Sequence, residues 1–398
     1  MRARTVLAGA ALTLGLTLAA VPQARAGQQL EGVPRYDHVG VLVLENESES
    51  STWGAGSVAK FLNSLVSSGA FASNYYADGH VSLDNYITLT SGLPGNADTY
   101  SDCLSSNLFT CQASVTAQQV PPNSALNVAD QVESSGQSWK EYADSAPSTC
   151  FHADLSPIVK PPDPYQGNST AAPAGNYADR HNPFVYYTDI TGNAARCAAH
   201  DVPFTQLSGD IAADTMPNYF FITPDTCHDG HDSPCASGSP MPAFCPGGAA
   251  AAATAGGLTA ADCWLYANLP SLLQYLYGHN GVLFITTDEG SSSDTAGCCT
   301  GGQAGQQGVG GKVGLLAIGP GVAAGTTSAH PYDHVSLLRT MEDALGIGVY
   351  LNNASTATAM SDLFAQPAAN SPEVPLAALL PLAGAAALIA WRRRTSRA

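Results

Sequence analysis

Apolar runs alternate with amphipathic segments along much of the chain, a pattern typical of an α/β domain with a mostly parallel sheet. Apolar and β-branched residues predominate in four runs that predict buried strands, namely His38–Leu44, Asn218–Thr223, Gly281–Thr287 and Lys312–Gly319. Apolar residues recur at helical spacing in Val58–Gly69 and in Asp333–Gly346, and the second segment ends at a glycine, as helices commonly do.

The middle of the chain departs from this pattern. Residues 95–210 are rich in Pro, Gly, Ser and Cys and show only weak periodicity, and residues 245–257 are a low-complexity Ala/Gly tract. We therefore expect one domain, residues 27–368, whose sheet carries disulfide-rich insertions at about 95–210 and 232–265.

The first 26 residues have the three parts of a secretory signal. Arg2 and Arg4 supply the charge, Val6 to Val21 is apolar, and Ala24-Arg25-Ala26 gives a small-x-small cleavage pattern. The pattern predicts export across the cytoplasmic membrane and a mature chain that begins near Gly27.

A second membrane-type segment lies at residues 369–398. A proline-led linker precedes the apolar stretch Leu376–Trp391, and Arg392, Arg393 and Arg394 follow it. Positive residues favour the cytoplasmic side, so we expect a short transmembrane anchor, or a processed sorting tail, that leaves the domain at the cell surface. A buried C-terminal helix is the alternative.

Cysteine count and charge narrow the chemistry. Ten cysteines in an exported chain predict disulfides, whose pairing the sequence leaves open; a zinc site is the alternative, although no CxxC occurs. The net charge of −17 argues against a nucleic-acid partner. An acidic protein can still act on phosphate esters if a metal ion supplies positive charge.

Polar, ionisable residues follow three of the predicted strands. In open α/β sheets, ligands bind beyond the carboxyl ends of the strands. The residues that follow the strands are Glu45 and Asn46, then Asp225, His228, Asp229 and His231, then Asp288 and Glu289. The oxygen ligands favour Mg²⁺, Ca²⁺ or Mn²⁺, and the histidines extend the choice to Zn²⁺. Such an ion lowers the pKa of a bound hydroxyl, which would activate a serine.

Ser82, in the stretch "GHVSLDNY", admits two interpretations. It could cap a helix over Leu83–Ser91 that stops at Gly92. It could equally be a nucleophile, because a helix N-terminus is a docking point for phosphate. His80 and Asn85 would then donate hydrogen bonds to phosphoryl oxygens. The residues alone leave both interpretations open.

Six segments follow one another along the chain: "HVGVLVLENESESSTWG", "GHVSLDNYITLTSG", "RHNPFVYY", "MPNYFFITPDTCHDGHD", "LFITTDEG" and "YDHVSLLRTMEDALGI". In this order they resemble the bacterial phosphoesterase family of secreted acid phosphatases and phosphocholine-type phospholipases C. The acid-phosphatase branch is the most similar. The resemblance implies an alkaline-phosphatase-like fold, a three-layer α/β/α sandwich with a mostly parallel central sheet.

The resemblance also implies roles for individual residues. The implied metal ligands are Glu45, Asn46, Ser82, Asp288 and Glu289. Ser82 would be the nucleophile, with His80, Asn85, Asp229 and His231 at substrate-contacting positions. His231 and His334 would stabilise the transferring phosphate or protonate the leaving group.

Four positions depart from the family pattern. Val81 and Asp84 replace two prolines around the serine, and Asp225 replaces an asparagine. Glu47 stands where many relatives have a polar or basic residue. These positions are where differences in substrate choice or metal affinity would arise.

Together these observations predict an exported, metal-dependent phosphomonoesterase that forms a phosphoserine and takes a small phosphate ester or a phospholipid headgroup. A phospholipase C or other phosphodiesterase of the same family is the alternative enzyme. A catalytically inactive protein for surface display is the alternative from another class.

Overall fold

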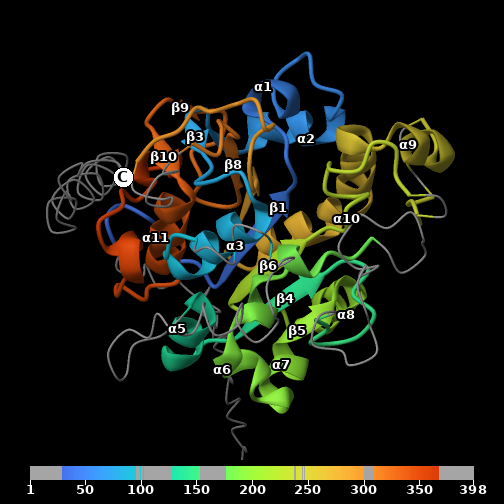
Figure 1. The fold of residues 1–398 in the computed structure, drawn as a ribbon. Helices are drawn as coiled ribbons and strands as arrows, with labels where there is room; N and C mark the ends of the chain where they lie inside the picture. Colours follow the sequence, from blue (N-terminus) through green and yellow to red (C-terminus); the bar gives the residue numbers. More distant parts are fainter. Residues whose placement is uncertain are drawn as a thin grey trace, which may run out of the picture.

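The computed structural model describes residues 29–95, 99, 102, 127–152, 176–236, 239–243, 245, 247–299 and 309–366. Within these residues, an eight-stranded sheet has the order β5-β4-β6-β1-β7-β8-β2-β9 (Figure 1). The strands are β1 (His38–Leu44), β2 (Ala70–Ala72), β4 (Trp139–Ala143), β5 (Asp201–Pro203), β6 (Tyr219–Thr223), β7 (Gly281–Thr287), β8 (Leu315–Ile318) and β9 (Thr327–Ser328). The strands from β5 to β7 run parallel, and β8 is antiparallel to both of its neighbours. Two short strands, β3 (Tyr75–Tyr76) and β10 (Tyr332–Asp333), pair separately.

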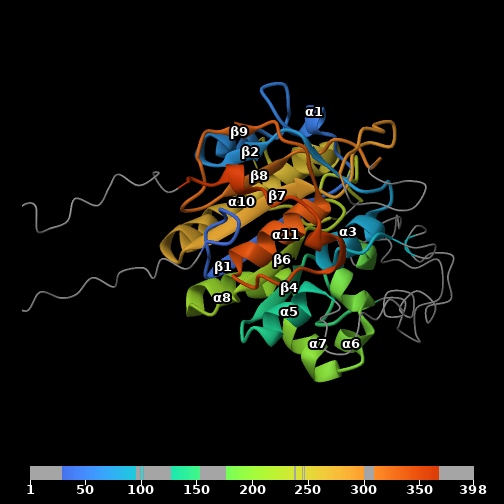
Figure 2. The same ribbon diagram turned by 90° about the vertical axis from the view of Figure 1, so that its left-hand side faces the viewer.

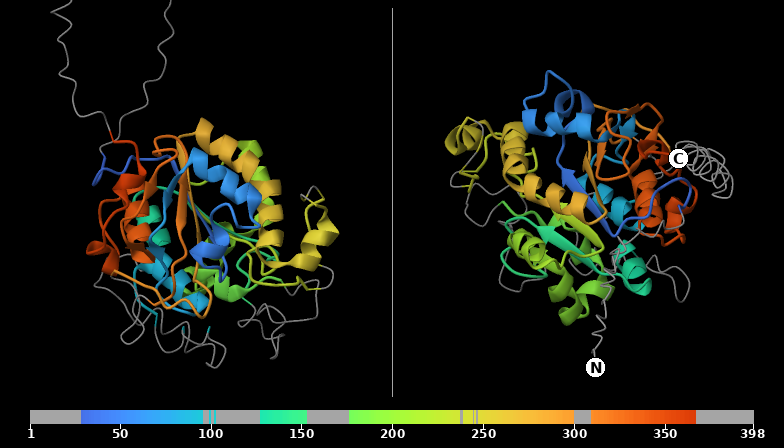
Figure 3. Two further views of the ribbon diagram at one scale, coloured as in Figure 1. Left: turned by 90° about the horizontal axis from the view of Figure 1, so that it is seen from above. Right: turned by 180° about the vertical axis from the view of Figure 1, so that it is seen from behind.

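Helices cover both faces of the sheet. One face packs against α3 (Ser82–Ser91), α5 (Val128–Ser134) and α11 (His334–Ala344). The other packs against α2 (Lys60–Leu65), α8 (Leu207–Ala213) and α10 (Gly257–Gly278). Figure 3 shows α10 and α11 on opposite sides of the strands, and α11 packs against α3 (Figure 2). The predicted three-layer α/β/α sandwich is confirmed.

The strand pattern explains the two cores. Val39, Val41 and Val43 point into the core shared with α3 and α11, whereas Leu42 and Leu44 point into the core shared with α10. This alternation follows from the two-residue period of a strand. A strand apolar on both faces is suited to the middle of a parallel sheet.

Shorter elements complete the described part of the chain. The helices are α1 (Glu49–Thr52), α6 (Thr188–Thr191), α7 (Ala194–His200) and α9 (Ala249–Ala255). The 3₁₀ turns are η1 (Val66–Ser68), η4 (Asp179–His181), η5 (Pro183–Tyr186), η6 (Phe204–Gln206), η7 (Asn352–Ser355) and η8 (Ser361–Leu363).

The interpretation of residues 95–210 as an insertion outside the sheet was wrong for the part that the structure describes. This segment supplies β4 and β5, which extend the sheet beyond β6 (Figure 1). The β4 sequence WKEYA contains two charged residues, so its apolar pattern is too weak to predict the buried strand that forms there. Lys140 pairs with Asp210 at 2.6 Å, and Glu141 accepts a hydrogen bond from Thr223 Oγ1 at 2.7 Å.

Disulfides are confirmed among the described cysteines. The pairs are Cys150–Cys197, Cys227–Cys235, Cys245–Cys263 and Cys298–Cys299. Cys103 and Cys111 lie outside the described residues, as do the predicted signal and the predicted anchor at 369–398. A search of the described helices found none with the length and apolarity that a membrane span requires.

Candidate active site

The carboxyl ends of β1 and β7 bring two acidic strand endings together. Leu44 is in register with Thr287, and the Asp288 N–H donates to the Leu44 carbonyl at 2.9 Å. Asn46 then contacts both residues that follow β7. Its backbone N–H donates to Asp288 Oδ1 at 3.1 Å, and its Nδ2 donates to Glu289 Oε1 at 2.9 Å. The polar residues that follow β1 and β7 therefore lie together at one edge of the sheet, as expected from the sequence. These residues are Glu45, Asn46, Asp288 and Glu289.

Ser82 faces this acidic group from the start of α3. Val81, not Ser82, is the N-cap residue, and no side chain caps the helix there. The Ser82 hydroxyl instead donates to Glu45 Oε2 at 3.0 Å. The capping interpretation was thus wrong by one residue, whereas the predicted stop at Gly92 is confirmed by its φ of 68°.

A second layer of contacts surrounds Glu45, whose side chain is fully buried. Tyr86 donates its hydroxyl to Glu45 Oε1 at 2.7 Å. His181 places Nε2 3.3 Å from the same oxygen and Nδ1 3.5 Å from Asp229 Oδ2. The imidazole also stacks on the Tyr86 ring at 5.5 Å. Burial lowers the pKa of His181 well below its usual value, so the ring is neutral between the two carboxyl groups.

The N-terminus of α3 meets a carboxylate and an arginine. The Leu83 N–H donates to Asp102 Oδ1 at 3.0 Å, and Arg180 Nε lies 4.0 Å from Asp102 Oδ2. Burial by itself would lower the pKa of Arg180, but Asp102 and the nearby carboxyl groups raise it, so the guanidinium stays charged. Free helix N–H groups and a buried guanidinium are the donors that bind phosphate.

Sequence reasoning assigned no role to Arg180, His181, Tyr86 or Asp102. The first two open the segment "RHNPFVYY", which resembles the family, but no predicted strand precedes them. In the structure they belong to the single turn η4, which approaches α3. Two adjacent residues with basic side chains, shortly before an apolar run, were the signal available for them.

The side chain of Asn85, one of the predicted site residues, holds the local backbone in place. The Asn85 side chain accepts from the N–H groups of Asp78 and Gly79 and donates to the carbonyls of Gly79 and Val81. It therefore fixes the turn that leads into Ser82.

His334 is fully buried between two partners. Its Nδ1 lies 2.9 Å from the Tyr75 hydroxyl, and its Nε2 donates to the Asp288 carbonyl at 2.6 Å. Burial lowers its pKa to about 4, so the ring is neutral and holds the backbone of Asp288 in place.

The other two predicted histidines lie at the rim of the site. His80 Nε2 donates to the Asp294 carbonyl at 2.8 Å, and its Nδ1 lies 3.9 Å from Glu289 Oε2. The His231 backbone N–H donates to Asp229 Oδ1 at 2.8 Å, and its ring Nδ1 lies 2.9 Å from Asp232 Oδ1. That hydrogen bond raises the pKa of His231, and the field of Glu45 acts in the same direction.

Crowding and burial disfavour negative charge on the acidic group. Burial raises the pKa of Glu45 and of Asp288 well above the usual range, and a neighbouring carboxyl group adds to each shift. Burial together with Glu45 raises the pKa of Glu289 to about 9. A bound cation would offset this repulsion.

The donor atoms fit a hard divalent cation. Three buried oxygens, Asn46 Oδ1, Asp288 Oδ2 and Glu289 Oε2, have no hydrogen-bond partner within the described residues. Buried polar atoms normally have such a partner. Carboxylate and amide oxygens are the ligands that Mg²⁺, Ca²⁺ and Mn²⁺ take in proteins. The residues present therefore suit such an ion.

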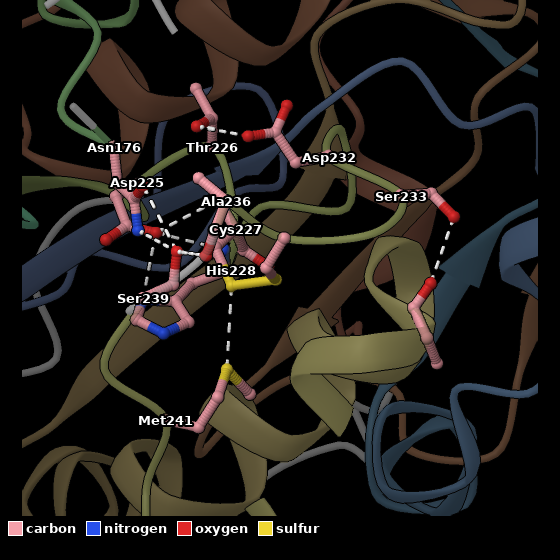
Figure 4. Close-up of a disulfide and its surroundings, with 12 residues drawn as sticks. Asn176, Asp225, Thr226, Cys227, His228, Asp232, Ser233, Ala236, Ser239 and Met241 are labelled. Carbon is pink, nitrogen blue, oxygen red and sulfur yellow. Dashed lines mark hydrogen bonds and ion pairs between the residues drawn. A yellow bond between two sulfur atoms is a disulfide. The ribbon is translucent and has the colours of Figure 1, made fainter. Parts of the chain in front are cut away.

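A disulfide brackets the loop that carries Asp229 and His231. Cys227 and Cys235 are joined, and Cys227 Sγ lies 3.5 Å from Met241 Sδ (Figure 4). Asp225 accepts from the N–H groups of Cys227 and His228 at 3.0 and 3.1 Å. The replacement of asparagine by Asp225 thus leaves a side-chain oxygen that accepts from this turn.

Comparison with known proteins agrees with this geometry. The sequence profile of the Phosphoesterase family matches residues 38–243. The chain belongs to the phosphoesterase family. It is therefore a hydrolase of phosphoric ester bonds, as its resemblance to that family predicted.

Individual relatives are distant. A phosphatidylinositol-3-phosphatase of Mycobacterium tuberculosis is 25% identical over 286 residues, which cover 71% of this chain and 73% of that protein. An acid phosphatase of Aspergillus fumigatus is 27% identical over 169 residues, 42% of this chain and 32% of that protein. The chain thus spans about a third of the length of that fungal acid phosphatase.

Solved structures are similar to this chain at low sequence identity. A Bacteroides thetaiotaomicron structure, described in connection with the metabolism of multiple glycosaminoglycans, has a TM-score of 0.50 and 9% identity and covers 85% of this chain and 78% of its own. A Vibrio parahaemolyticus protein of the alkaline phosphatase superfamily has a TM-score of 0.47 and 11% identity, over 80% and 71% of the two chains.

Proposed function

We propose that the protein is an exported, metal-dependent phosphomonoesterase that works through a phosphoserine at Ser82. The observation that carries the proposal is the position of the Ser82 hydroxyl. It lies at the start of a helix and 3.0 Å from a carboxylate of the oxygen-rich group at the sheet edge. The names of the relatives, a phosphoinositide phosphatase and an acid phosphatase, support phosphomonoesters as substrates. The disulfides support an oxidising compartment.

The acidic group would hold the cation. The proposed ligands are Glu45, Asn46, Ser82, Asp288 and Glu289. A divalent cation bound there polarises a phosphoryl oxygen and lowers the pKa of the serine hydroxyl. Asn85 and His334 would act by positioning Ser82 and Asp288, with the contacts described above.

The remaining residues suit the two displacements. Ser82 Oγ attacks phosphorus while the bond to the leaving alcohol breaks. The N–H groups in the first turn of α3, among them that of Leu83, which donates to Asp102 in this structure, and the Arg180 guanidinium hold the phosphoryl oxygens. His80 can share this role from the rim. His231, whose pKa is raised by its hydrogen bond to Asp232, gives a proton to the leaving oxygen. Asp229 orients His231 by accepting a hydrogen bond from the His231 backbone N–H. Water then hydrolyses the phosphoserine.

Replacement of the nucleophile tests this function. Ser82→Ala is expected to lower kcat for p-nitrophenyl phosphate at least about a thousandfold, as nucleophile removal does in other hydrolases. Ser91→Ala, at the far end of the same helix, is the matched control and should keep normal turnover. Circular dichroism would show that both variants fold. Near-normal turnover in a folded Ser82→Ala variant would refute the proposal.

A further inference from the structure

A polar pocket of about 550 Å³ adjoins the site at His231. We propose that this pocket binds the alcohol part of the substrate and selects monophosphates of small, uncharged polyols. The inference rests on the proposed function and adds its substrate class. Side chains that line the pocket include Glu47, Ser51, Ser57, His231, Ser233 and Thr259.

The backbone at Gly230 and His231 lines the pocket and also packs against Glu45 of the proposed site. Gly230 lines the pocket, and a Cβ at this position would lie 3.3 Å from the Glu45 carbonyl and 3.6 Å from Glu47 Cγ. Glu47 itself follows directly on Glu45 and Asn46. His231, which we propose as the proton donor to the leaving oxygen, lies in the pocket wall. An alcohol that leaves with the proton of His231 therefore enters this space.

The chemistry of the lining suits hydroxyl groups. Serine and threonine hydroxyls and glycine backbone make up most of the wall, beside the apolar Val58, Ala255 and Leu258. A hydroxyl oxygen that donates within the protein can still accept from a polyol. Glu47 Oε2 accepts from Ser51 Oγ at 2.7 Å. Within the described residues, Glu47 Oε1 has no hydrogen-bond partner and can accept from a substrate hydroxyl.

The same lining disfavours other alcohols. Within the described residues, the pocket lining has no Phe, Tyr or Trp, and its one imidazole, that of His231, lies 2.9 Å from Asp232 Oδ1. It therefore offers no large aromatic face for stacking a nucleobase or for enclosing a quaternary ammonium group. Among the residues that the structure describes, the lining also has no Lys or Arg to pair with a second phosphate, and an ionised Glu47 repels one. Repulsion of the wrong substrate is a common source of specificity.

The two displacements account for every bond and proton. The P–O bond to the polyol breaks as the bond from Ser82 Oγ to phosphorus forms, and the hydroxyl proton of Ser82 is released to solvent. The polyol oxygen takes the proton of His231 and departs as a neutral alcohol. Water then attacks the phosphoserine: its hydroxyl joins phosphorus to give hydrogen phosphate, its other proton goes to Ser82 Oγ, and His231 regains a proton from solvent.

Steady-state kinetics of the metal-loaded protein on matched esters tests the inference. Fructose 6-phosphate and hexyl phosphate compare hydroxyls at equal carbon number, and fructose 1,6-bisphosphate adds a second charge. The expected kcat/KM for fructose 6-phosphate exceeds both others by about tenfold or more. Glu47→Gln is expected to reduce the discrimination against the bisphosphate about tenfold. Thr259→Phe, which fills the pocket, should reduce the preference for fructose 6-phosphate over hexyl phosphate.

Glu49→Gln is the matched control, because Glu49 lies on the same short segment but faces Lys312 at 3.7 Å and does not line the pocket. It should leave both ratios as they are in the unmodified protein. If the three esters are hydrolysed equally, or if neither Glu47→Gln nor Thr259→Phe changes the ratios, the pocket is not the alcohol site. If the unmodified protein hydrolyses no monoester, including p-nitrophenyl phosphate, the proposed function itself fails.

Discussion

At the scale of single residues, Asp102 contacts two of the groups that we propose as the phosphate site. Its carboxylate accepts from the Leu83 N–H and lies beside the Arg180 guanidinium, which are two of the groups proposed to hold phosphoryl oxygens. A substrate that binds there must displace or share these contacts. The apparent affinity for phosphate is therefore set partly by an internal competitor.

Asp102→Asn is expected to lower both KM for p-nitrophenyl phosphate and the inhibition constant of inorganic phosphate, by about three- to tenfold, because a charged hydrogen-bond acceptor is removed from the anion site. Asp214→Asn, at an exposed helix end, is the control. Steady-state kinetics measures both constants. An unchanged or raised KM in the Asp102 variant would show that the carboxylate does not compete.

Asp84 is the residue that replaces a family proline, and it is fully buried within α3. Its oxygens lie against the neighbouring loops, since a Cβ on Gly79 would be 2.7 Å from Asp84 Oδ2. Burial, with Asp102 adding to it, raises the pKa of Asp84 to about 7. The group is therefore neutral at acidic pH and costs stability once it ionises.

The raised pKa of Asp84 determines how the stability of the folded protein changes with pH. A carboxyl group with a raised pKa contributes fully to stability below its unfolded pKa, and the protein loses that contribution as pH rises toward 7. Asp84→Asn is expected to increase the free energy of unfolding by about 2 kcal/mol at pH 8 and to change it little at pH 4. Urea denaturation at the two pH values measures the difference. A stabilisation that is equal at both would contradict this assignment.

At the scale of elements, the sequence predicted best where a strand is apolar on both faces. β1 and β7 have the predicted bounds, and α11 lies within its predicted segment. β4 was missed because Lys140 and Glu141 interrupt its apolar run, and their partners, Asp210 and Thr223, come from distant parts of the chain.

The candidate site was predictable where its residues directly follow strands that are apolar on both faces. The residues that follow β1 and β7 could be placed together because parallel strands bring their carboxyl ends to one edge. Arg180 and His181 could not, because they lie on a single 3₁₀ turn whose position depends on tertiary packing.

The loop between Cys227 and Cys235 gives a prediction at this scale. The disulfide closes a short loop that carries Asp229 and His231, so it limits how far these side chains can move from Glu45. The double variant Cys227→Ser/Cys235→Ser is expected to lower kcat/KM by about ten- to a hundredfold, as displacement of catalytic groups by about an ångström does. The matched double variant Cys298→Ser/Cys299→Ser should have a smaller effect. Equal activities would mean that packing alone holds the loop.

At the scale of the whole molecule, the fold brings several carboxyl groups together at one edge of the sheet, where a bound cation would offset their mutual repulsion. Removal of the metal with a chelator is expected to lower Tm, and an added divalent cation should restore it, since a ligand that binds only the folded state stabilises that state. Differential scanning calorimetry measures the shift.

Glu289→Gln separates metal binding from general destabilisation. It should weaken the metal-dependent rise in Tm, while the metal-free variant should be more stable than the metal-free unmodified protein, because one carboxyl group of the crowded set is removed. A chelator that leaves Tm and activity unchanged would contradict the proposed metal site.

The most direct test of the central claim is to trap the covalent intermediate. The protein is mixed with p-nitrophenyl phosphate, quenched in acid, digested and examined by mass spectrometry. The account predicts one added phosphoryl group on the peptide that contains Ser82, and its absence in Ser82→Ala. Rapid turnover with no phosphate on that peptide, or with phosphate on another residue, would contradict the account.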